Sequence, residues 1–302
     1  TYIGRIEHVF FCNINCAYCF YTTGHEKRSR HRVYPKNVSF VAERIISVGF
    51  DTVILSGGDP LQSRFKHETY VFIRELKIQG LRVIVNTSAA CLNEDDLDTI
   101  VSLGVDRVDV SIDSHDASIH DAQRGRHVDA VSAITGLIRK GYRHVVTTTV
   151  VTSLNASTLL ETISWLRDLG VEDVRIQRVF LPDNHNDTGG VMQAMYFVEP
   201  YLCASHALEY IELTERAFDG RPAPRRAQCR MGKEYFVCNA QGMLTPCFHR
   251  DDIVLGNLFN DPVDALVEAF ENHDLTAYDM PPCFGGHCAS LFDIPTFWRE
   301  QP

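Results

Sequence analysis

The sequence lacks the long apolar stretches of a membrane protein. None of its 302 residues lies in an unbroken apolar run of the roughly 18 residues that cross a bilayer. No charged segment followed by an apolar one precedes the first cysteines, and no low-complexity tract interrupts the chain. At 45% apolar residues, the chain can bury a substantial core. We therefore expect a soluble, cytoplasmic protein without a membrane partner.

An excess of basic residues is also missing. Lys and Arg number 29 against 39 Asp and Glu, which gives a formal net charge of −10. Nucleic-acid binding needs clustered positive charge opposite the phosphates, so we expect no nucleic-acid partner. The acidic balance suits a small cationic substrate, although it is also typical of proteins that are charged only for solubility.

Cysteine, by contrast, is abundant and unevenly placed. Three of the ten cysteines fall between residues 12 and 19, and five follow residue 228. In a chain of this length without a secretion signal, such clusters are more typical of metal ligands than of disulfides. Cys91 and Cys203 stand alone, and we expect both to be ordinary buried thiols.

Short apolar runs alternate with helical patterns over about the first 180 residues. The runs predict six strands, at residues 8–11, 53–55, 83–85, 108–112, 145–151 and 174–176. Apolar residues at helical spacing predict helices at 38–48, 128–138 and 159–166, each followed by a glycine. This alternation implies right-handed crossovers and a parallel sheet. We predict an α/β fold, a partial (β/α)6 barrel, with its chemistry at the carboxyl ends of the strands.

The pattern changes after about residue 182. A polar loop at 183–190 precedes a predicted helix at 203–218, and the remaining chain is cysteine-rich, with a predicted hairpin turn at 239–242. We therefore divide the chain into a barrel domain, 1–190, and a smaller C-terminal domain, 191–302.

The first cysteine cluster directly follows the first predicted strand. Cys12, Cys16 and Cys19 read Cys-x3-Cys-x2-Cys, with Tyr18 before the third cysteine. Three thiolates can hold three irons of a cubane and leave the fourth iron open, whereas a closed zinc site needs four ligands. The spacing resembles the signature of the radical S-adenosylmethionine (SAM) superfamily. The resemblance implies a [4Fe-4S] cluster that binds SAM and cleaves it to a 5'-deoxyadenosyl radical.

Further residues at strand ends resemble the SAM-binding positions of that superfamily. Residues 57–60 resemble its Gly-Gly-Glu-Pro element, with Asp in place of Glu, and the arginine fork of Arg124 suits the SAM carboxylate. Ordinary strand-end hydrogen bonds would also account for Asn86 and Gln177. The resemblance implies cofactor contacts from Tyr18, Gly57, Gly58, Asp59, Pro60, Asn86, Ser111, Asp113, Arg124 and Gln177.

The C-terminal cysteines resemble the shortened auxiliary-cluster domain called twitch, a relative of the SPASM domain. Cys229, Gly242 and Cys247 read Cys-x12-Gly-x4-Cys, and the resemblance implies a second [4Fe-4S] cluster, with structural zinc as the alternative. Five cysteines compete for four ligand places. We assign Cys247 as the spare thiol, although the family pattern would free Cys238 instead. The metal ligands are then Cys229, Cys238, Cys283 and Cys288.

Taken together, these features resemble the small twitch enzymes of aminoglycoside biosynthesis. The resemblance implies an epimerase that inverts a carbon of a small cationic sugar, with the spare thiol returning the hydrogen atom. It also implies a low-potential reductant such as flavodoxin or ferredoxin. A dehydrogenase of an aminocyclitol or aminoglycoside alcohol, a peptide-modifying enzyme and a non-catalytic metal-stabilised scaffold are the alternatives.

Overall fold

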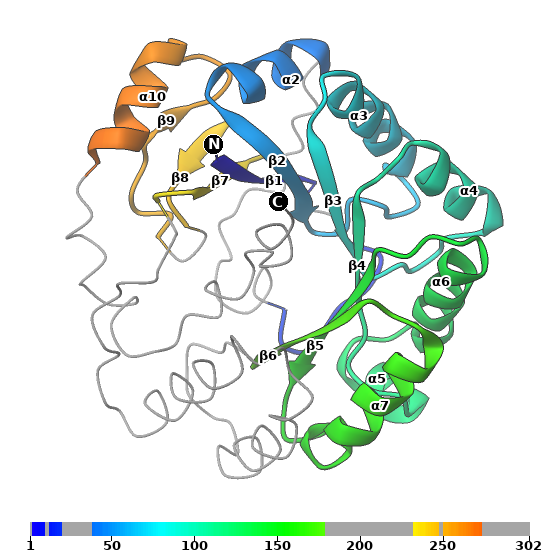
Figure 1. Ribbon diagram of the computed structural model, residues 1–302. Helices are drawn as coiled ribbons and strands as arrows, with labels where there is room; N and C mark the ends of the chain where they lie inside the picture. The colour runs from blue at the N-terminus through cyan, green and yellow to red at the C-terminus, as the bar shows by residue number, and fades with distance from the viewer. Residues whose placement is uncertain (1, 10–11, 20–37, 179–231, 248–249, 274–302) are drawn as a thin grey trace.

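The computed structural model describes residues 2–9, 12–19, 38–178, 232–247 and 250–273. Within these ranges, nine strands form one continuous sheet in the order β6-β5-β4-β3-β2-β1-β7-β8-β9 (Figure 1). The strands are β1 (Tyr2–Val9), β2 (Phe50–Gly57), β3 (Arg82–Thr87), β4 (Arg107–Ser111), β5 (Val145–Val151), β6 (Asp173–Arg178), β7 (Tyr235–Asn239), β8 (Met243–Thr245) and β9 (Gly256–Asn257). The helices are α2 (Val38–Ser47), α3 (Lys66–Ile78), α4 (Glu94–Ser102), α5 (Ala117–Gln123), α6 (His127–Arg139), α7 (Leu159–Leu169) and α10 (Val263–Asn272), with a 3-10 turn η1 (Ala156–Thr158).

The first six strands run parallel, and helices lie on the convex side of their curved sheet (Figure 1). The predicted α/β partial barrel is therefore confirmed. Strand β7 also pairs with β1 in parallel, and β8 and β9 continue the sheet as antiparallel strands. The predicted hairpin thus extends the barrel sheet, while the predicted helix at 203–218 and the domain boundary at 190 lie outside the described residues.

The two faces of the sheet have different packing partners. Side chains alternate between the faces of a strand. Val53 and Leu55 of β2 enter the large core shared with the helices. Ile54, between them, belongs to a small apolar cluster with Ile84 and Val237, which is built without helix residues. The face opposite the helices is called the concave face below.

Strand β1 begins earlier than the apolar pattern predicts. It spans Tyr2–Val9, whereas the prediction was 8–11. Ile6 packs in the helix-side core, so Arg5 and Glu7 alternate with it toward the concave face. A strand with polar residues on one face gives no continuous apolar run, which is why its first half was missed. The last two residues of the predicted run lie outside the described ranges.

Helix ends follow local chemistry. The predicted helices correspond to α2, α6 and α7, and α7 ends at Gly170 with a left-handed backbone, φ 92°. Four further helices, α3, α4, α5 and α10, go beyond the predicted set. Of these, α4 had a readable signal, because Asn93 and Asp96 form a reciprocal capping box at its start. Each helix in the described ranges is too short or too polar to cross a membrane.

Gly57 closes β2 where its backbone meets the end of β1. Its φ is +117°, and a Cβ atom there would stand 2.1 Å from the carbonyl oxygen of Val9. That same carbonyl accepts a hydrogen bond from the Gly58 amide. The tight approach therefore admits only glycine at this position.

We expect Gly57→Ala to destabilise the protein by at least about 3 kcal/mol, because a steric clash adds to left-handed strain of roughly 1–2 kcal/mol. The matched control is Gly80→Ala, since Gly80 has φ +81° and a Cβ atom added there would meet nothing within 4 Å. Thermal melting of the two reconstituted variants measures the difference. Equal losses of Tm in both variants would contradict the close approach at Gly57.

Candidate active site

The three N-terminal cysteines follow β1 at the carboxyl end of the sheet. They lie in a short loop of bends and turns, in which the Cys19 amide donates to the Cys16 carbonyl at 3.1 Å. Cys12 reaches the surface, yet the protein packed around its sulfur, with the Asp59 carboxylate, raises its pKa to about 12. Burial also raises the pKa of Cys16, and Arg124 opposes that rise. Bound metal therefore has to displace protons from these thiols.

The end of α5 holds this loop in place. The Ala17 amide donates to the Gln123 carbonyl at 2.8 Å. Arg124 places Nη1 4.0 Å from the Cys16 sulfur, and its guanidinium lies 5.4 Å from the centre of the Tyr18 ring. A positive charge therefore lies beside the predicted cluster ligands, where it would favour bound thiolates.

Asp113, just beyond β4, joins these groups. Its side chain is 0% exposed and accepts from Arg124 Nε at 3.1 Å and Nη2 at 3.2 Å. It also accepts from the Tyr18 hydroxyl and from the Val150 amide. Burial, together with the negative charge of Asp113, raises the pKa of Tyr18 well above its usual range. The phenol therefore stays protonated and donates to the carboxylate.

The geometry leaves one end of Arg124 available near the cysteines. Asp113 engages Nε and Nη2, so Nη1 is the end that faces Cys16. This end would be able to donate to a carboxylate bound beside the cysteine loop. The arrangement fits the predicted contact of Arg124 with the SAM carboxylate.

Asp59 of the Gly-Gly-Asp-Pro segment has its carboxylate turned into the protein. It is 2% exposed and accepts from the Leu61 amide at 3.0 Å, the Thr87 hydroxyl at 2.8 Å and the Ser88 amide at 2.9 Å. The Ser88 hydroxyl also donates to it. Burial raises the pKa of Asp59, which these hydrogen bonds oppose. The carboxylate thus ties the loop after β2 to the end of β3, and the glycine backbone is left for a ligand.

Two buried polar atoms near this loop have no hydrogen-bond partner among the described residues. They are Ser56 Oγ and Asn86 Oδ1. Ser56 lies two residues after Ile54 and Asn86 two residues after Ile84, so both share the concave face with these residues. The register pairs Leu55 with Val85, the residues just before them on the two strands. An unsatisfied buried polar atom costs about 1–3 kcal/mol. Such atoms fit a ligand rich in hydroxyl and amino groups, as SAM is.

The remaining predicted cofactor residues lie at strand ends. Ser111 is half-buried at the end of β4, and Gln177 lies in β6, where its backbone pairs with Val150 of β5. The structure therefore gathers residues from the ends of β1 to β4 around the cysteine loop. It also adds residues that no motif indicated: Thr87, Ser88, His120 and Gln123.

The C-terminal cysteines are described only in part. Cys238 of β7 packs in the helix-side core, and burial, with Glu7 adding to it, strongly raises its pKa. Cys247 follows β8 and is 3% exposed in the concave-face cluster. The other predicted ligands, Cys229, Cys283 and Cys288, lie outside the described residues, as does Cys203.

Cys91 corrects the expectation of a buried thiol. It is exposed in the connection between β3 and α4, with a left-handed backbone of φ 71°. Its amide donates to Asp129 Oδ2 at 3.0 Å, and Arg126 Nη2 lies 3.3 Å from its sulfur. Single-residue hydrophobicity suggested burial, whereas the turn between two elements places this side chain at the surface.

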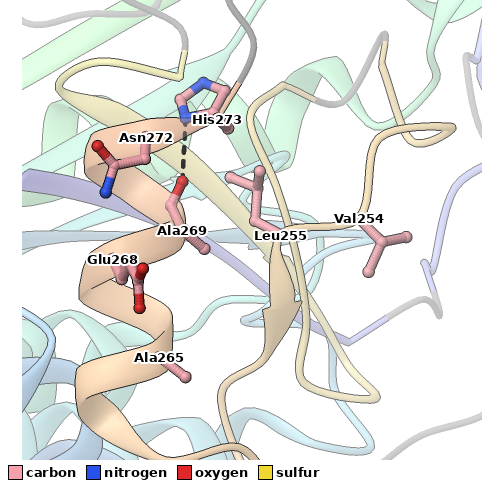
Figure 2. A pocket seen from close by; sticks show the side chains of 7 residues that line it. All are labelled: Val254, Leu255, Ala265, Glu268, Ala269, Asn272 and His273. Atoms are coloured by element: carbon pink, nitrogen blue, oxygen red, sulfur yellow. Dashed lines mark hydrogen bonds between the residues drawn. The ribbon is translucent and has the colours of Figure 1, made fainter.

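A cavity of about 360 Å³ lies away from these residues, beside α10 (Figure 2). His273 is among its lining residues and donates from Nδ1 to the Ala269 carbonyl at 3.2 Å. Its lining comes from α10 and the segment before β9: Val254, Leu255, Ala265, Glu268, Ala269, Asn272 and His273. None of the predicted site residues lines this cavity.

A parallel partial barrel with a three-cysteine loop after its first strand and a Gly-Gly loop after its second defines an iron-sulfur enzyme class. Residues 6–189 match the radical SAM superfamily, and the chain belongs to it. SAM and a [4Fe-4S] cluster are accordingly its cofactors.

The chain is also similar in sequence to named enzymes. A probable GTP 3',8-cyclase of Sulfurisphaera tokodaii is 30% identical over 290 residues, which cover 88% of this chain and 90% of the relative. An AdoMet-dependent heme synthase of Methanosarcina barkeri is 27% identical over 53% of this chain and 45% of its own length. The relatives' names thus indicate other reactions than the predicted epimerisation.

Among solved structures, anSMEcpe with bound AdoMet superposes with a TM-score of 0.66 at 15% identity, covering 88% of this chain and 80% of its own. SuiB of Streptococcus suis with bound S-adenosylmethionine has a TM-score of 0.67 at 12% identity, covering 91% and 64%. At these identities the likeness concerns the fold.

We expect Cys12→Ala, Cys16→Ala and Cys19→Ala each to abolish formation of 5'-deoxyadenosine from SAM, because an incomplete ligand set cannot hold the cluster. Chromatography of anaerobic reaction mixtures measures this product. The control is Cys91→Ala, which removes an exposed thiol from another loop and should cleave SAM at the wild-type rate. Cleavage near that rate in any cluster variant would place the SAM cluster elsewhere.

Proposed function

We propose that the protein is a radical SAM epimerase that inverts one sugar carbon of an aminoglycoside, in the manner of neomycin C epimerase acting on neomycin C to form neomycin B. Cys247 is the proposed hydrogen donor. The observation that carries the proposal is the place of this thiol, on the concave face of the sheet and buried among apolar side chains.

The concave face also carries the unsatisfied polar atoms described above. Cys247 packs in one cluster with Ile54 and Ile84. Ser56 and Asn86 lie on the same face, two residues and therefore roughly 7 Å further along their strands than Ile54 and Ile84. A thiol in this cluster therefore lies on the side of the sheet where a ligand of those atoms would bind.

Cys238 occupies the opposite face. Adjacent residues of a strand point to opposite faces, so Val237 points to the concave face and Cys238 to the helices. The sheet itself separates this thiol from the concave side. This placement supports Cys247 rather than Cys238 as the donor.

When bound, the cofactors would supply a 5'-deoxyadenosyl radical able to take a hydrogen atom from one substrate carbon. The Cys247 thiol then gives its hydrogen atom to that carbon from the opposite side, so a C–H bond forms, the S–H bond breaks and the configuration inverts. The protonated thiol is the form that has a hydrogen atom to give. One electron and one proton restore the thiol, with a flavodoxin or ferredoxin as the proposed electron source.

The proposed auxiliary [4Fe-4S] cluster uses Cys229, Cys238, Cys283 and Cys288. In the alternative assignment Cys247 is a ligand, and Cys238 is an inert thiol of the helix-side core. The proposed substrate is a polyamine sugar, which the net charge of −10 favours through long-range attraction.

A second candidate function is the cyclisation of GTP. It rests on the probable GTP 3',8-cyclase that is 30% identical along 88% of this chain. The two candidates require substrates of opposite charge, a polyanion for the cyclase and a polycation for the epimerase. Cys247 would not have the same role in the two reactions. One pair of assays, with an aminoglycoside and with GTP, separates the two candidates.

We expect the reconstituted enzyme, incubated in deuterated water with SAM and a reductant, to convert neomycin C to an epimer carrying one deuterium. The reason is that a thiol exchanges its hydrogen with solvent before it donates. Mass spectrometry detects the label. A parallel incubation with GTP should leave GTP unchanged. A cyclised GTP product would favour the second candidate, and an oxidised aminoglycoside without deuterium would favour a dehydrogenase.

We expect Cys247→Ala to retain about eight irons, the content of two cubanes, and to form 5'-deoxyadenosine without inverted product. Cys238→Ala should lose about half of the iron, because it removes a proposed ligand. Iron analysis and the ratio of 5'-deoxyadenosine to product measure both effects. The opposite pattern, with iron lost in Cys247→Ala and uncoupled turnover in Cys238→Ala, would exchange the two roles.

A further inference from the structure

His120 of α5 is a buried histidine that neither the sequence motifs nor the cofactor assignments include. Its side chain is 1% exposed. Its Nδ1 accepts from the Asp113 backbone amide at 3.1 Å, and its Nε2 lies 3.1 Å from the Gly125 carbonyl oxygen. Because a backbone amide can only donate, Nδ1 has no proton, and Nε2 is the donor to Gly125.

This pair of hydrogen bonds requires a neutral ring. Burial lowers the pKa of His120 to about 4, although the Asp113 carboxylate opposes that shift. The imidazole therefore keeps one fixed tautomer at neutral pH. A fixed tautomer with one acceptor and one donor gives the two bonded segments a defined separation.

The two segments carry the two halves of the buried ion pair. Asp113 follows β4, and Arg124 follows α5 and precedes Gly125. The backbone carbonyl of His120 also accepts from the Arg124 amide at 2.8 Å and the Gly125 amide at 3.2 Å. One residue thus bonds to the backbone on both sides of the Asp113–Arg124 contact.

The same end of α5 continues to the cysteine loop. Gln123 accepts from the Ala17 amide, and Arg124 lies beside Cys16 and the Tyr18 ring. A shift of this helix end relative to Asp113 would therefore move the arginine and the cysteine loop together.

We propose that His120 is a positioning residue of the SAM site: it sets the position of Arg124 against Asp113 and thereby the position of the cysteine loop. The inference rests on the assignment of Arg124 and Asp113 to SAM, and it is independent of the substrate. His120 acts through these two residues and needs no contact with SAM itself.

His127 provides a matched control. It is a second buried histidine, with its ring 5.3 Å from that of His120 and stacked on Trp165 at 6.1 Å. It makes no hydrogen bond to Asp113 or Gly125 among the described contacts. Loss of its ring removes a buried imidazole from the same aromatic cluster without removing a hydrogen bond to Asp113 or Gly125.

The test measures SAM cleavage without any sugar or nucleotide, together with iron content, Tm and the spectral change of the reduced cluster on SAM addition. We expect His120→Ala to raise the KM for SAM at least tenfold at wild-type iron content. His127→Ala should lower Tm by a smaller amount, because its ring bonds neither Asp113 nor Gly125, and should leave that KM unchanged. Equal KM changes in both variants, or an unchanged KM in His120→Ala, would overturn the inference.

Conservative variants keep the test decisive even if His120→Ala does not fold. The amide oxygen of His120→Asn can accept from Asp113, whereas the amide nitrogen of His120→Gln can donate to Gly125. We expect the asparagine variant to bind SAM more tightly than the glutamine variant, since it retains the bond to the ion-paired residue. The reverse order, or no difference, would contradict positioning through Asp113.

A parallel Arg124→Ala variant tests the assignment of Arg124 to SAM separately from the positioning role of His120. An unchanged KM for SAM in Arg124→Ala would show that the assignment of this arginine to SAM fails, and the inference with it. A raised KM in Arg124→Ala with an unchanged KM in His120→Ala would overturn only the role of His120. Either result leaves the substrate assays of the epimerase unaffected.

Discussion

The candidate site depends on one buried carboxylate, that of Asp113. Removing a carboxylate from water costs several kcal/mol unless charged and polar donors replace the solvent. Here a two-point contact from Arg124, the Tyr18 hydroxyl and the Val150 amide replace it. These donors come from the cysteine loop, the end of α5 and strand β5. The need to satisfy one charge therefore holds in register three segments that are distant in sequence.

A second buried carboxylate, Asp59, has the same function on the neighbouring strands. It bonds Thr87 and Ser88 at the end of β3, while the Gly58 amide of the same loop bonds the Val9 carbonyl of β1. In both cases hydrogen-bond donors of the protein itself satisfy the carboxylate. What remains for a ligand is the backbone, one end of an arginine and a few unsatisfied polar atoms on the concave face.

The sequence by itself determined the elements that depend on local pattern. Apolar spacing predicted α2, α6 and α7, and the runs of β2 to β6 predicted the parallel sheet, because each signal lies within one short segment. The cysteine spacing likewise predicted the class of cofactor. The same locality explains what was missed in β1, where Arg5 and Glu7 interrupt the apolar pattern.

Only the tertiary structure decided which residues meet. Cys238 faces the helix-side core because β7 pairs with β1 in a register that places it beside Ile6, whereas Cys247, beyond β8, packs in the concave-face cluster. His120 can bond both segments because the chain after α5 brings the Gly125 carbonyl within reach of the same imidazole that accepts from the Asp113 amide. Strand register and helix-end closure are set by packing between distant segments, so no local pattern of residues records them.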